Sequence, residues 1–220
     1  SRYLADHYDE FVYAGQVRHL FRNEYWERIV GGDCSPGIYQ NGGYWGTASG
    51  WIGYAIAQVN PALASRMFGD LIDYYLTNGP YESVNDAVQH RRNKFYSAAV
   101  TLPLAALRRL SEITDVSKMP PPSKPATNLA EAMKWLEGEA HRIIRDSAVP
   151  MKDGTTAFPP QVGIGYDAFW LRDYEYALEG SIQSFSDKEL TDACRLFIKA
   201  MRGDGAAVDC VRFAGTPIYK

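Results

Sequence analysis

The spacing of hydrophobic residues along the chain predicts helices almost throughout. Pro103 is expected to kink or interrupt its helix, and Ser186 with Glu189 three residues later is typical of a capping box. No stretch has the pattern of a convincing sheet, although the tail from residue 203 onward has room for a strand or an extended arm. The pattern therefore predicts an all-α fold. The expected helices cover residues near 8–29, 47–59, 61–77, 94–113, 128–147, 168–185 and 187–202.

A proline-rich stretch divides the chain into two helical segments. Residues 119–125 read MPPPSKP, which cannot continue a helix and has the composition of a linker. We therefore expect segments 1–118 and 128–220, joined by a linker at 119–127. A chain of 220 residues is long enough for one domain or two small ones.

Composition places the chain among folded globular proteins and argues against several classes of partner. Hydrophobic residues make up 46% of the chain and charged residues 22%, which is untypical of a disordered protein. The net charge of −3 and the lack of a basic tract argue against binding to nucleic acid. No hydrophobic run approaches the roughly 20 residues that a membrane-spanning helix needs, so we expect no membrane partner.

Cysteine usage favours a reducing compartment such as the cytoplasm. Cys34, Cys194 and Cys210 are odd in number and widely spaced, without a CxxC pair. Buried free thiols are the favoured interpretation, and one disulfide with a spare thiol is the alternative. Since the four histidines form no metal-binding motif either, we expect no metal and no cofactor.

The first candidate binding motif is the glycine-rich stretch 37–47, which reads GIYQNGGYWGT. Its aromatic rings offer flat faces that suit the CH face of a sugar, and its amide side chains supply donors and acceptors for hydroxyl groups. Its paired glycines let the backbone approach a ligand closely. The alternative is an Asn-Gly turn before an ordinary helix. The candidate contact residues are Tyr39, Gln40, Asn41, Gly42, Gly43 and Trp45.

Two acidic residues are candidates for acid–base chemistry. Asp173 follows Trp170 and Arg172 near a predicted helix start, where aromatic and charged neighbours can tune the pKa of a carboxyl group. Glu82 lies on a predicted loop after a helix, a common position for a catalytic group. The alternatives are structural. Asp173 would then stabilise a helix N-terminus beside a surface ion pair of Arg172, and Glu82 would lie in a solvated acidic loop.

Together these motifs resemble those of glycoside hydrolases with a six-hairpin (α/α) toroid, the neutral invertase-like enzymes and related bacterial glycosidases. Residues 170–173, WLRD, are similar to a W-x-R-D signature in an early hairpin of that family. Residues 39–45, YQNGGYW, are similar to a loop in its later hairpins. The resemblance implies helical hairpins of a toroid and a carbohydrate substrate.

Carried over to this chain, the resemblance makes Asp173 a catalytic carboxylate and Glu82 the second one. Trp170, Arg172 and the 39–45 loop would line the sugar pocket. Glycoside cleavage needs one carboxyl group that protonates the leaving oxygen and one ionised carboxylate. The implied function is hydrolysis of a small glycoside or oligosaccharide. The alternative is a non-catalytic carbohydrate-binding or helical scaffold module.

The chain departs from that family in order and in size. Segment 1–118 resembles the late hairpins and segment 128–220 the early ones, so the order is reversed. Six hairpins, at about 11–12 residues per helix, need more than 220 residues once loops are added. We therefore expect a permuted or partial toroid, whose open hairpin flank is covered by a second copy in a homodimer.

Overall fold

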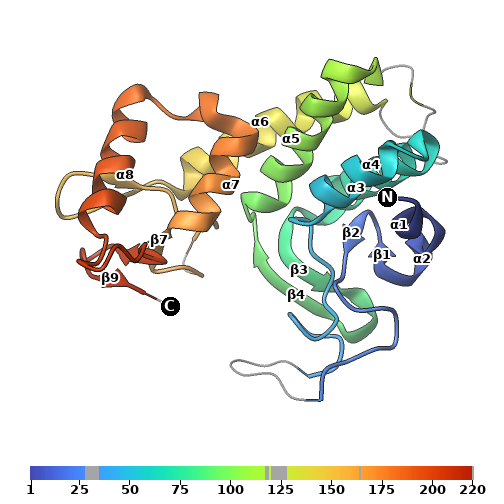
Figure 1. The fold of residues 1–220 in the computed structure, drawn as a ribbon, viewed down its shortest axis with the longest axis horizontal. Helices are drawn as coiled ribbons and strands as arrows, with labels where there is room; N and C mark the ends of the chain where they lie inside the picture. The colour runs from blue at the N-terminus through green and yellow to red at the C-terminus, as the bar shows by residue number, and fades with distance from the viewer. Residues whose placement is uncertain (28–34, 117–118, 120–127, 164, 220) are drawn as a thin grey trace.

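Figure 1 shows the computed structural model of the chain. The structure describes residues 1–27, 35–116, 119, 128–163 and 165–219. Its elements, in chain order, are α1 (Arg2–Asp6), α2 (Tyr8–Phe11), β1 (Val12–Tyr13), β2 (Gln16–Val17), α3 (Ser49–Ala57), α4 (Pro61–Asn78), β3 (Tyr81–Asn85), the 3₁₀ helix η1 (Asp86–Val88), β4 (His90–Lys94), α5 (Ala98–Ile113), α6 (Leu129–Ser147), β5 (Val149–Pro150), β6 (Thr156–Ala157), β7 (Ala168–Trp170), α7 (Leu171–Ser181), the 3₁₀ helix η3 (Ile182–Ser184), α8 (Asp187–Lys199), β8 (Cys210–Arg212) and β9 (Pro217–Ile218).

The all-α expectation is wrong, because the structure contains strands as well as helices. Helices make up 51% of it and strands 15%. Within the described ranges the strands form four small antiparallel sheets: β1–β2, β3–β4, β5–β6 and a three-stranded sheet in the order β7–β8–β9. The fold is therefore mixed α/β and not an (α/α) toroid.

Two hairpins replace helix or loop in the first half of the chain. The helix expected near residues 8–29 is instead the short α2 and the hairpin β1–β2, followed by a stretch without helix or strand up to residue 27. The two-residue turn of this hairpin places Ala14 and Gly15 at φ values of 47° and 70°, as the tightest hairpin turns require. The strand β3 is buried at four of its five positions, so it lacks the alternation that predicts a strand. Its partner β4 delays the start of α5 to Ala98.

The longer predicted helices are confirmed. Their start signals lie in neighbouring residues of the sequence. α4 starts at Pro61, and the Asn60 side chain caps it by accepting a hydrogen bond from the backbone N–H of Leu63. The capping box of α8 is present. α5 runs through Pro103 without interruption.

Helix α5 forms the centre of the fold. Its residues Ala98–Leu107 are all buried, and α3, α6 and α7 pack against it (Figure 1). Two glycines permit the close approach. A Cβ atom at Gly50 of α3 would collide with the carbonyl group of Leu102, and one at Gly180 of α7 with that of Thr101. Because both positions are glycine, α3 and α7 pack directly against the backbone of α5.

The two expected segments meet in one of the buried hydrophobic clusters of the described residues. Leu136 and Ile143 of α6 belong to the same buried cluster as Phe68 of α4 and Leu104 of α5. Apart from Met119, which packs against that cluster, the expected linker at 119–127 lies outside the described residues.

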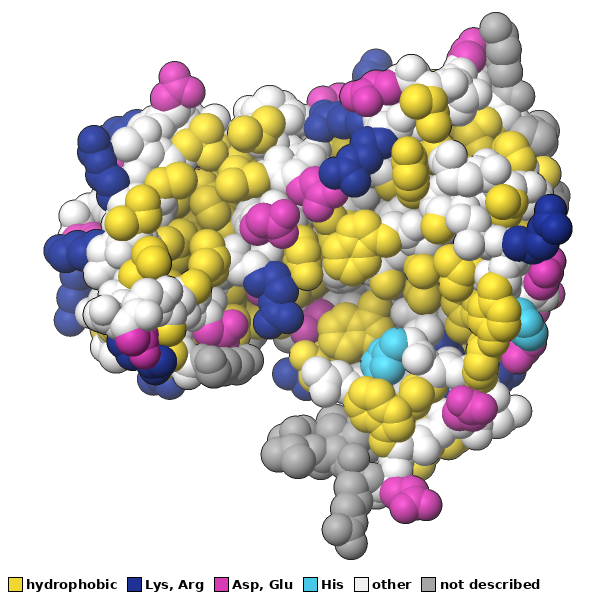
Figure 2. Space-filling model, viewed as in Figure 1, with side chains coloured by type: hydrophobic (Ala, Val, Ile, Leu, Met, Phe, Trp, Pro, Cys, Tyr) yellow, Lys and Arg dark blue, Asp and Glu magenta, His cyan; other side chains and the backbone are white. Residues whose placement is uncertain are grey.

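The surface carries mixed charge. Figure 2 shows positively and negatively charged side chains beside hydrophobic ones over the middle of one face.

Cys210 is buried in β8, whereas Cys194 is exposed on α8, so the expectation that Cys194 is buried is wrong. Cys34 lies outside the described residues. No described helix combines the length and the apolar character needed to cross a membrane.

Candidate active site

One cavity of about 500 Å³ brings most of the predicted site residues together. Both predicted carboxylates, Glu82 and Asp173, line it. The walls come from three separate stretches of the chain: the 39–51 region, the β3–β4 hairpin with the residues that follow it, and residues 165–176. The lining residues are Tyr39, Gln40, Trp45, Thr47, Trp51, Glu82, Arg92, Tyr96, Gly165, Tyr166, Asp167, Trp170, Arg172, Asp173 and Tyr176.

Backbone pairing brings the 39–45 loop to the β3–β4 hairpin. Tyr44 and Val84 exchange two backbone hydrogen bonds, of 2.8 and 2.9 Å. The same loop also pairs with β2, where Trp45 and Val17 exchange two backbone hydrogen bonds, of 2.8 and 3.1 Å. Since Glu82 lies two residues before Val84 on β3, the pairing fixes the carboxylate beside the aromatic loop.

The junction of β7 and α7 positions the second carboxylate. β7 pairs with β8, with Trp170 opposite Cys210, and α7 begins at the next residue. Asp173 therefore lies in the first turn of α7, where the helix dipole favours an acidic residue. Arg172 is exposed, with its Nη2 3.9 Å from Oδ1 of Asp209. The structural alternatives for both residues thus hold, and both residues also line the cavity.

Glu82 is almost fully buried, with 2% of its surface exposed, and it belongs to strand β3. The expectation of a loop, solvated or not, is therefore wrong. Its Oε1 accepts hydrogen bonds from the hydroxyls of Tyr39 at 3.1 Å and Tyr166 at 2.9 Å. Its Oε2 accepts one from the amide of Asn93 and lies 3.5 Å from Nε of Arg92. These donors supply the partners that a buried carboxylate requires.

Asp173 has a perturbed proton affinity. Burial raises its pKa, the hydrogen bond that Oδ1 accepts from the Tyr96 hydroxyl lowers it, the charge of Glu82 raises it and Arg172 lowers it. The net effect is a pKa above the ordinary value of an aspartate. Asp173 consequently keeps its proton to a higher pH than an exposed aspartate does, which suits a general acid.

The tyrosine hydroxyls that contact the two carboxylates remain protonated at neutral pH. Burial, with smaller contributions from nearby charges, raises the pKa of Tyr39 to about 12. Burial also raises the pKa of Tyr96 and Tyr166 well above the usual range of a tyrosine. Each hydroxyl therefore acts as a hydrogen-bond donor to Glu82 or Asp173.

Aromatic rings make up much of the cavity wall. Flat aromatic faces with polar tips suit a ligand that has both CH and OH groups. The guanidinium of Arg92 lies 4.0 Å from the centre of the Tyr39 ring and so brings a cation to the same wall. The ring pairs, with their centroid distances, are Tyr39–Trp45 at 4.8 Å, Trp51–Tyr176 at 5.6 Å and Tyr166–Trp170 at 5.9 Å.

Three of the predicted contact residues do not line this cavity. The side chain of Asn41 accepts a hydrogen bond from the backbone N–H of Trp26 at 2.7 Å and donates one to its carbonyl at 3.2 Å. A Cβ atom at Gly42 or Gly43 would come within 2.6 Å of neighbouring atoms. Asn41, Gly42 and Gly43 therefore shape the loop, whereas Tyr39, Gln40 and Trp45 line the cavity.

The sequence interpretation missed the residues that hold the carboxylates. Tyr96, Tyr166, Asn93 and Arg92 contact Glu82 or Asp173, yet none of them is among the predicted site residues. A weak signal was present in the 15 tyrosines of the chain, and Tyr166 precedes Trp170 by four residues. Within the described ranges, no group of three or more His, Cys, Asp or Glu side chains is arranged to hold a metal ion.

Comparison with family models, with curated proteins and with solved structures finds no match for the chain.

Proposed function

We propose that this protein hydrolyses a glycosidic bond in a small saccharide. The observation that carries the proposal is the meeting of two carboxyl groups from distant parts of the chain, Glu82 and Asp173, in one cavity walled by aromatic rings. The resemblance of residues 39–45 and 170–173 to loops of glycoside hydrolases supports the same chemistry.

Asp173 is the general acid of this proposal. Its raised pKa, caused first by burial, leaves it protonated closer to neutral pH. As the bond between the anomeric carbon and the leaving oxygen breaks, Asp173 gives its proton to that oxygen. A positioned acid of this kind typically contributes about 10²–10⁴-fold to the rate.

Glu82 is the ionised partner. Its oxygens accept hydrogen bonds from the hydroxyls of Tyr39 and Tyr166 and from the amide of Asn93. The positively charged guanidinium of Arg92 lies beside them. Such a carboxylate either takes a proton from the attacking water or attacks the anomeric carbon itself, as the separation of the two carboxyl groups dictates. In both cases the positive charge that develops on the sugar ring is stabilised by Glu82.

The substrate class follows from the wall of the cavity. The rings of Trp45 and Trp170 offer faces for the CH groups of a pyranose, while the exposed amide of Gln40 offers a donor and an acceptor for its hydroxyls. A cavity of about 500 Å³ falls within the usual range for small-molecule sites.

An activity screen with matched variants tests the proposal. Wild-type protein is incubated with aryl glycosides and with disaccharides, and the released sugar is measured. Asp173→Asn should abolish turnover of any disaccharide that the wild type cleaves. Glu175→Gln removes an exposed carboxylate from the same helix and should leave turnover unchanged. Equal rates for wild type and Asp173→Asn would refute the role of Asp173.

A further inference from the structure

We infer that a second cavity, next to the one just described, binds a further sugar ring of the same substrate. This second cavity has a volume of about 390 Å³, and its lining includes His19, Trp26, Gln40 and Trp45. The inference rests on the proposed function and names its substrate class: a saccharide of at least two rings.

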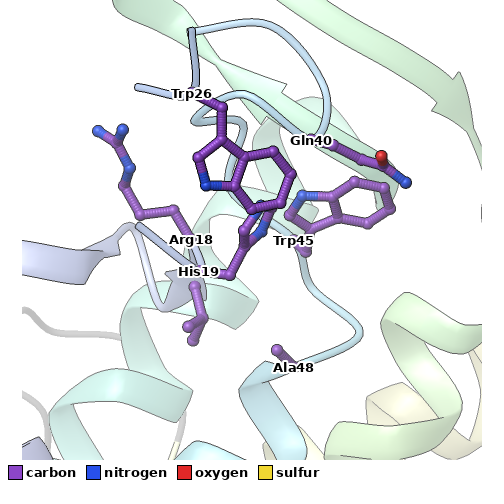
Figure 3. A pocket seen from close by; sticks show the side chains of 7 residues that line it. Arg18, His19, Trp26, Gln40, Trp45 and Ala48 are labelled. Carbon is purple, nitrogen blue, oxygen red and sulfur yellow. The ribbon is translucent and has the colours of Figure 1, made fainter. Parts of the chain in front are cut away.

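The two cavities are adjacent. Gln40 and Trp45 line both of them, so these two side chains form the border between the cavities. On the side of the first cavity, the Trp45 ring lies against Tyr39. Figure 3 shows side chains that line the second cavity, with the indoles of Trp26 and Trp45 next to each other and Gln40 beside Trp45. A ligand that extends beyond Trp45 from the first cavity would therefore meet the second cavity.

The second cavity is lined in the manner of a sugar site. The rings of His19 and Trp26 lie with their centroids 5.1 Å apart and are tilted by 49°. Burial lowers the pKa of His19, although its hydrogen bond to the backbone of Gln40 raises it. The neutral imidazole thus donates to Gln40 and leaves its other ring nitrogen as an acceptor. Two indole faces, an imidazole and the Gln40 amide match the CH faces and hydroxyl groups of a neutral sugar.

Arg18 also lines this cavity. Its guanidinium donates a hydrogen bond to the carbonyl of Glu24 at 3.0 Å. It also lies 5.5 Å from the ring centres of Tyr25 and Tyr44, and it points away from the two indoles in Figure 3. A carbonyl and two aromatic rings thus contact the guanidinium, although its buried Nε has no hydrogen-bond partner among the described residues.

The structure holds Trp26 in place at this cavity. Both backbone polar groups of Trp26 are bonded to the side chain of Asn41, although 45% of the Trp26 surface is exposed. These two bonds fix the backbone that carries the indole, so less freedom is lost at this position when a ligand stacks on Trp26. Asn41 thereby acts as a positioning residue for the second ring.

A comparison of two tryptophan variants tests the inference. Trp26 and Trp51 are exposed to nearly the same extent, 45% and 46%, but Trp26 lines only the second of the two cavities and Trp51 only the first. The variants Trp26→Ala and Trp51→Ala are made in the Asp173→Asn protein, which should bind substrate without cleaving it. Calorimetry then compares the affinity for a disaccharide that the wild type cleaves with the affinity for the methyl glycoside of its reacting ring.

Trp26→Ala should lower the affinity for the disaccharide relative to the methyl glycoside about tenfold. Trp51→Ala should weaken both ligands to a similar degree. Spectra of the indole N–H groups show whether each variant is folded, and Trp26→Phe should recover part of the lost affinity because it restores an aromatic face.

The failure of the subsite and the failure of the proposed function give different results. If the wild type cleaves a disaccharide but Trp26→Ala weakens both ligands equally or neither, the second cavity is not a subsite and the function stands. If the wild type neither cleaves nor binds any saccharide of one or two rings, the proposed function fails and the subsite fails with it.

Discussion

The hydroxyl of Tyr96 donates a hydrogen bond to Oδ1 of Asp173, across a sequence separation of 77 residues. Tyr96 lies just before α5, at the end of the β3–β4 hairpin, and Asp173 lies in the first turn of α7. The bond therefore joins the parts of the chain that supply Glu82 and Asp173. It also acts on the proton of Asp173, because it lowers the pKa that burial raises.

Tyr96→Phe should move the alkaline limb of the pH–activity profile to higher pH. Without the Tyr96 hydrogen bond, which favours the carboxylate, the pKa of Asp173 rises further. A general acid works while it is protonated, so activity should persist to higher pH. The measurement is kcat/KM against pH for a cleaved disaccharide.

Tyr13→Phe is the matched control for that profile. Its hydroxyl donates to Oδ2 of Asp86 at 3.0 Å, a tyrosine–aspartate pair that does not line the cavity. Tyr13→Phe should leave the alkaline limb in place. An alkaline limb that stays put in Tyr96→Phe, or moves to lower pH, would show that Asp173 is not the group being titrated.

Asp173→Asn should stabilise the fold at neutral pH and less so in acid. The folded-state pKa of Asp173 is raised, first by burial. Its contribution to stability is therefore fully present below the unfolded-state pKa and is lost as pH rises through the folded-state pKa. The neutral Asn avoids that loss. Thermal unfolding should show a gain in Tm for the variant that shrinks as the pH falls.

Glu189→Gln should show the opposite pH dependence. Burial raises the pKa of Glu189, but hydrogen bonds from Ser186 and Arg145 outweigh it and leave the pKa lowered. The stability that Glu189 contributes is present above its unfolded-state pKa and is lost as pH falls. The variant should therefore be less stable than wild type at neutral pH and approach it in acid. The same pH trend in Asp173→Asn and Glu189→Gln would contradict the assignment of the two shifts.

Asn41→Ala should destabilise the protein by about 1–3 kcal/mol, because two hydrogen bonds to the backbone of Trp26 are lost. Gln40→Ala, one residue earlier and exposed, should change the free energy of unfolding by less than about 0.5 kcal/mol. Urea unfolding measures both. A change of equal size in the two variants would mean that Asn41 does not hold the loop.

Gly180→Ala should destabilise the protein by about 2–3 kcal/mol or more, since its Cβ would collide with the Thr101 carbonyl on α5. Gly138→Ala is the control within another helix: no atom lies within 4 Å of its Cβ position, so alanine should stabilise α6 by about 0.5–1 kcal/mol. Chemical unfolding of both variants checks the contrast. A Gly180→Ala protein as stable as wild type would contradict the close packing of α7 on α5.

How far the sequence predicts the fold depends on how local each signal is. α4 and α8 carry their own start signals, in Asn60 with Pro61 and in Ser186 with Glu189, and both were predicted. Strand β3 was missed because it is buried at four of its five positions. The other strands are two to five residues long, which gives too little periodicity to distinguish them from loops.

The candidate site shows the same division. The motifs pointed to Asp173 and Glu82, and the structure places both at one cavity. The hydroxyls of Tyr96 and Tyr166 reach these carboxylates over 77 and 84 residues of sequence. Pairings of that range come from helix packing and hairpin geometry, which no local pattern in the sequence encodes.

Asp173 acts as the acid and Glu82 as the ionised carboxylate in the proposed reaction. The most direct test of these two roles is how the activity of each variant depends on the leaving group. For a disaccharide the wild type cleaves, Asp173→Asn and Glu82→Gln should each lower kcat/KM by at least about 100-fold. For the dinitrophenyl glycoside of the same sugar, whose leaving group departs without a proton, Asp173→Asn should retain most of the wild-type kcat/KM while Glu82→Gln stays impaired. Near-wild-type cleavage of the disaccharide by either variant would contradict the account.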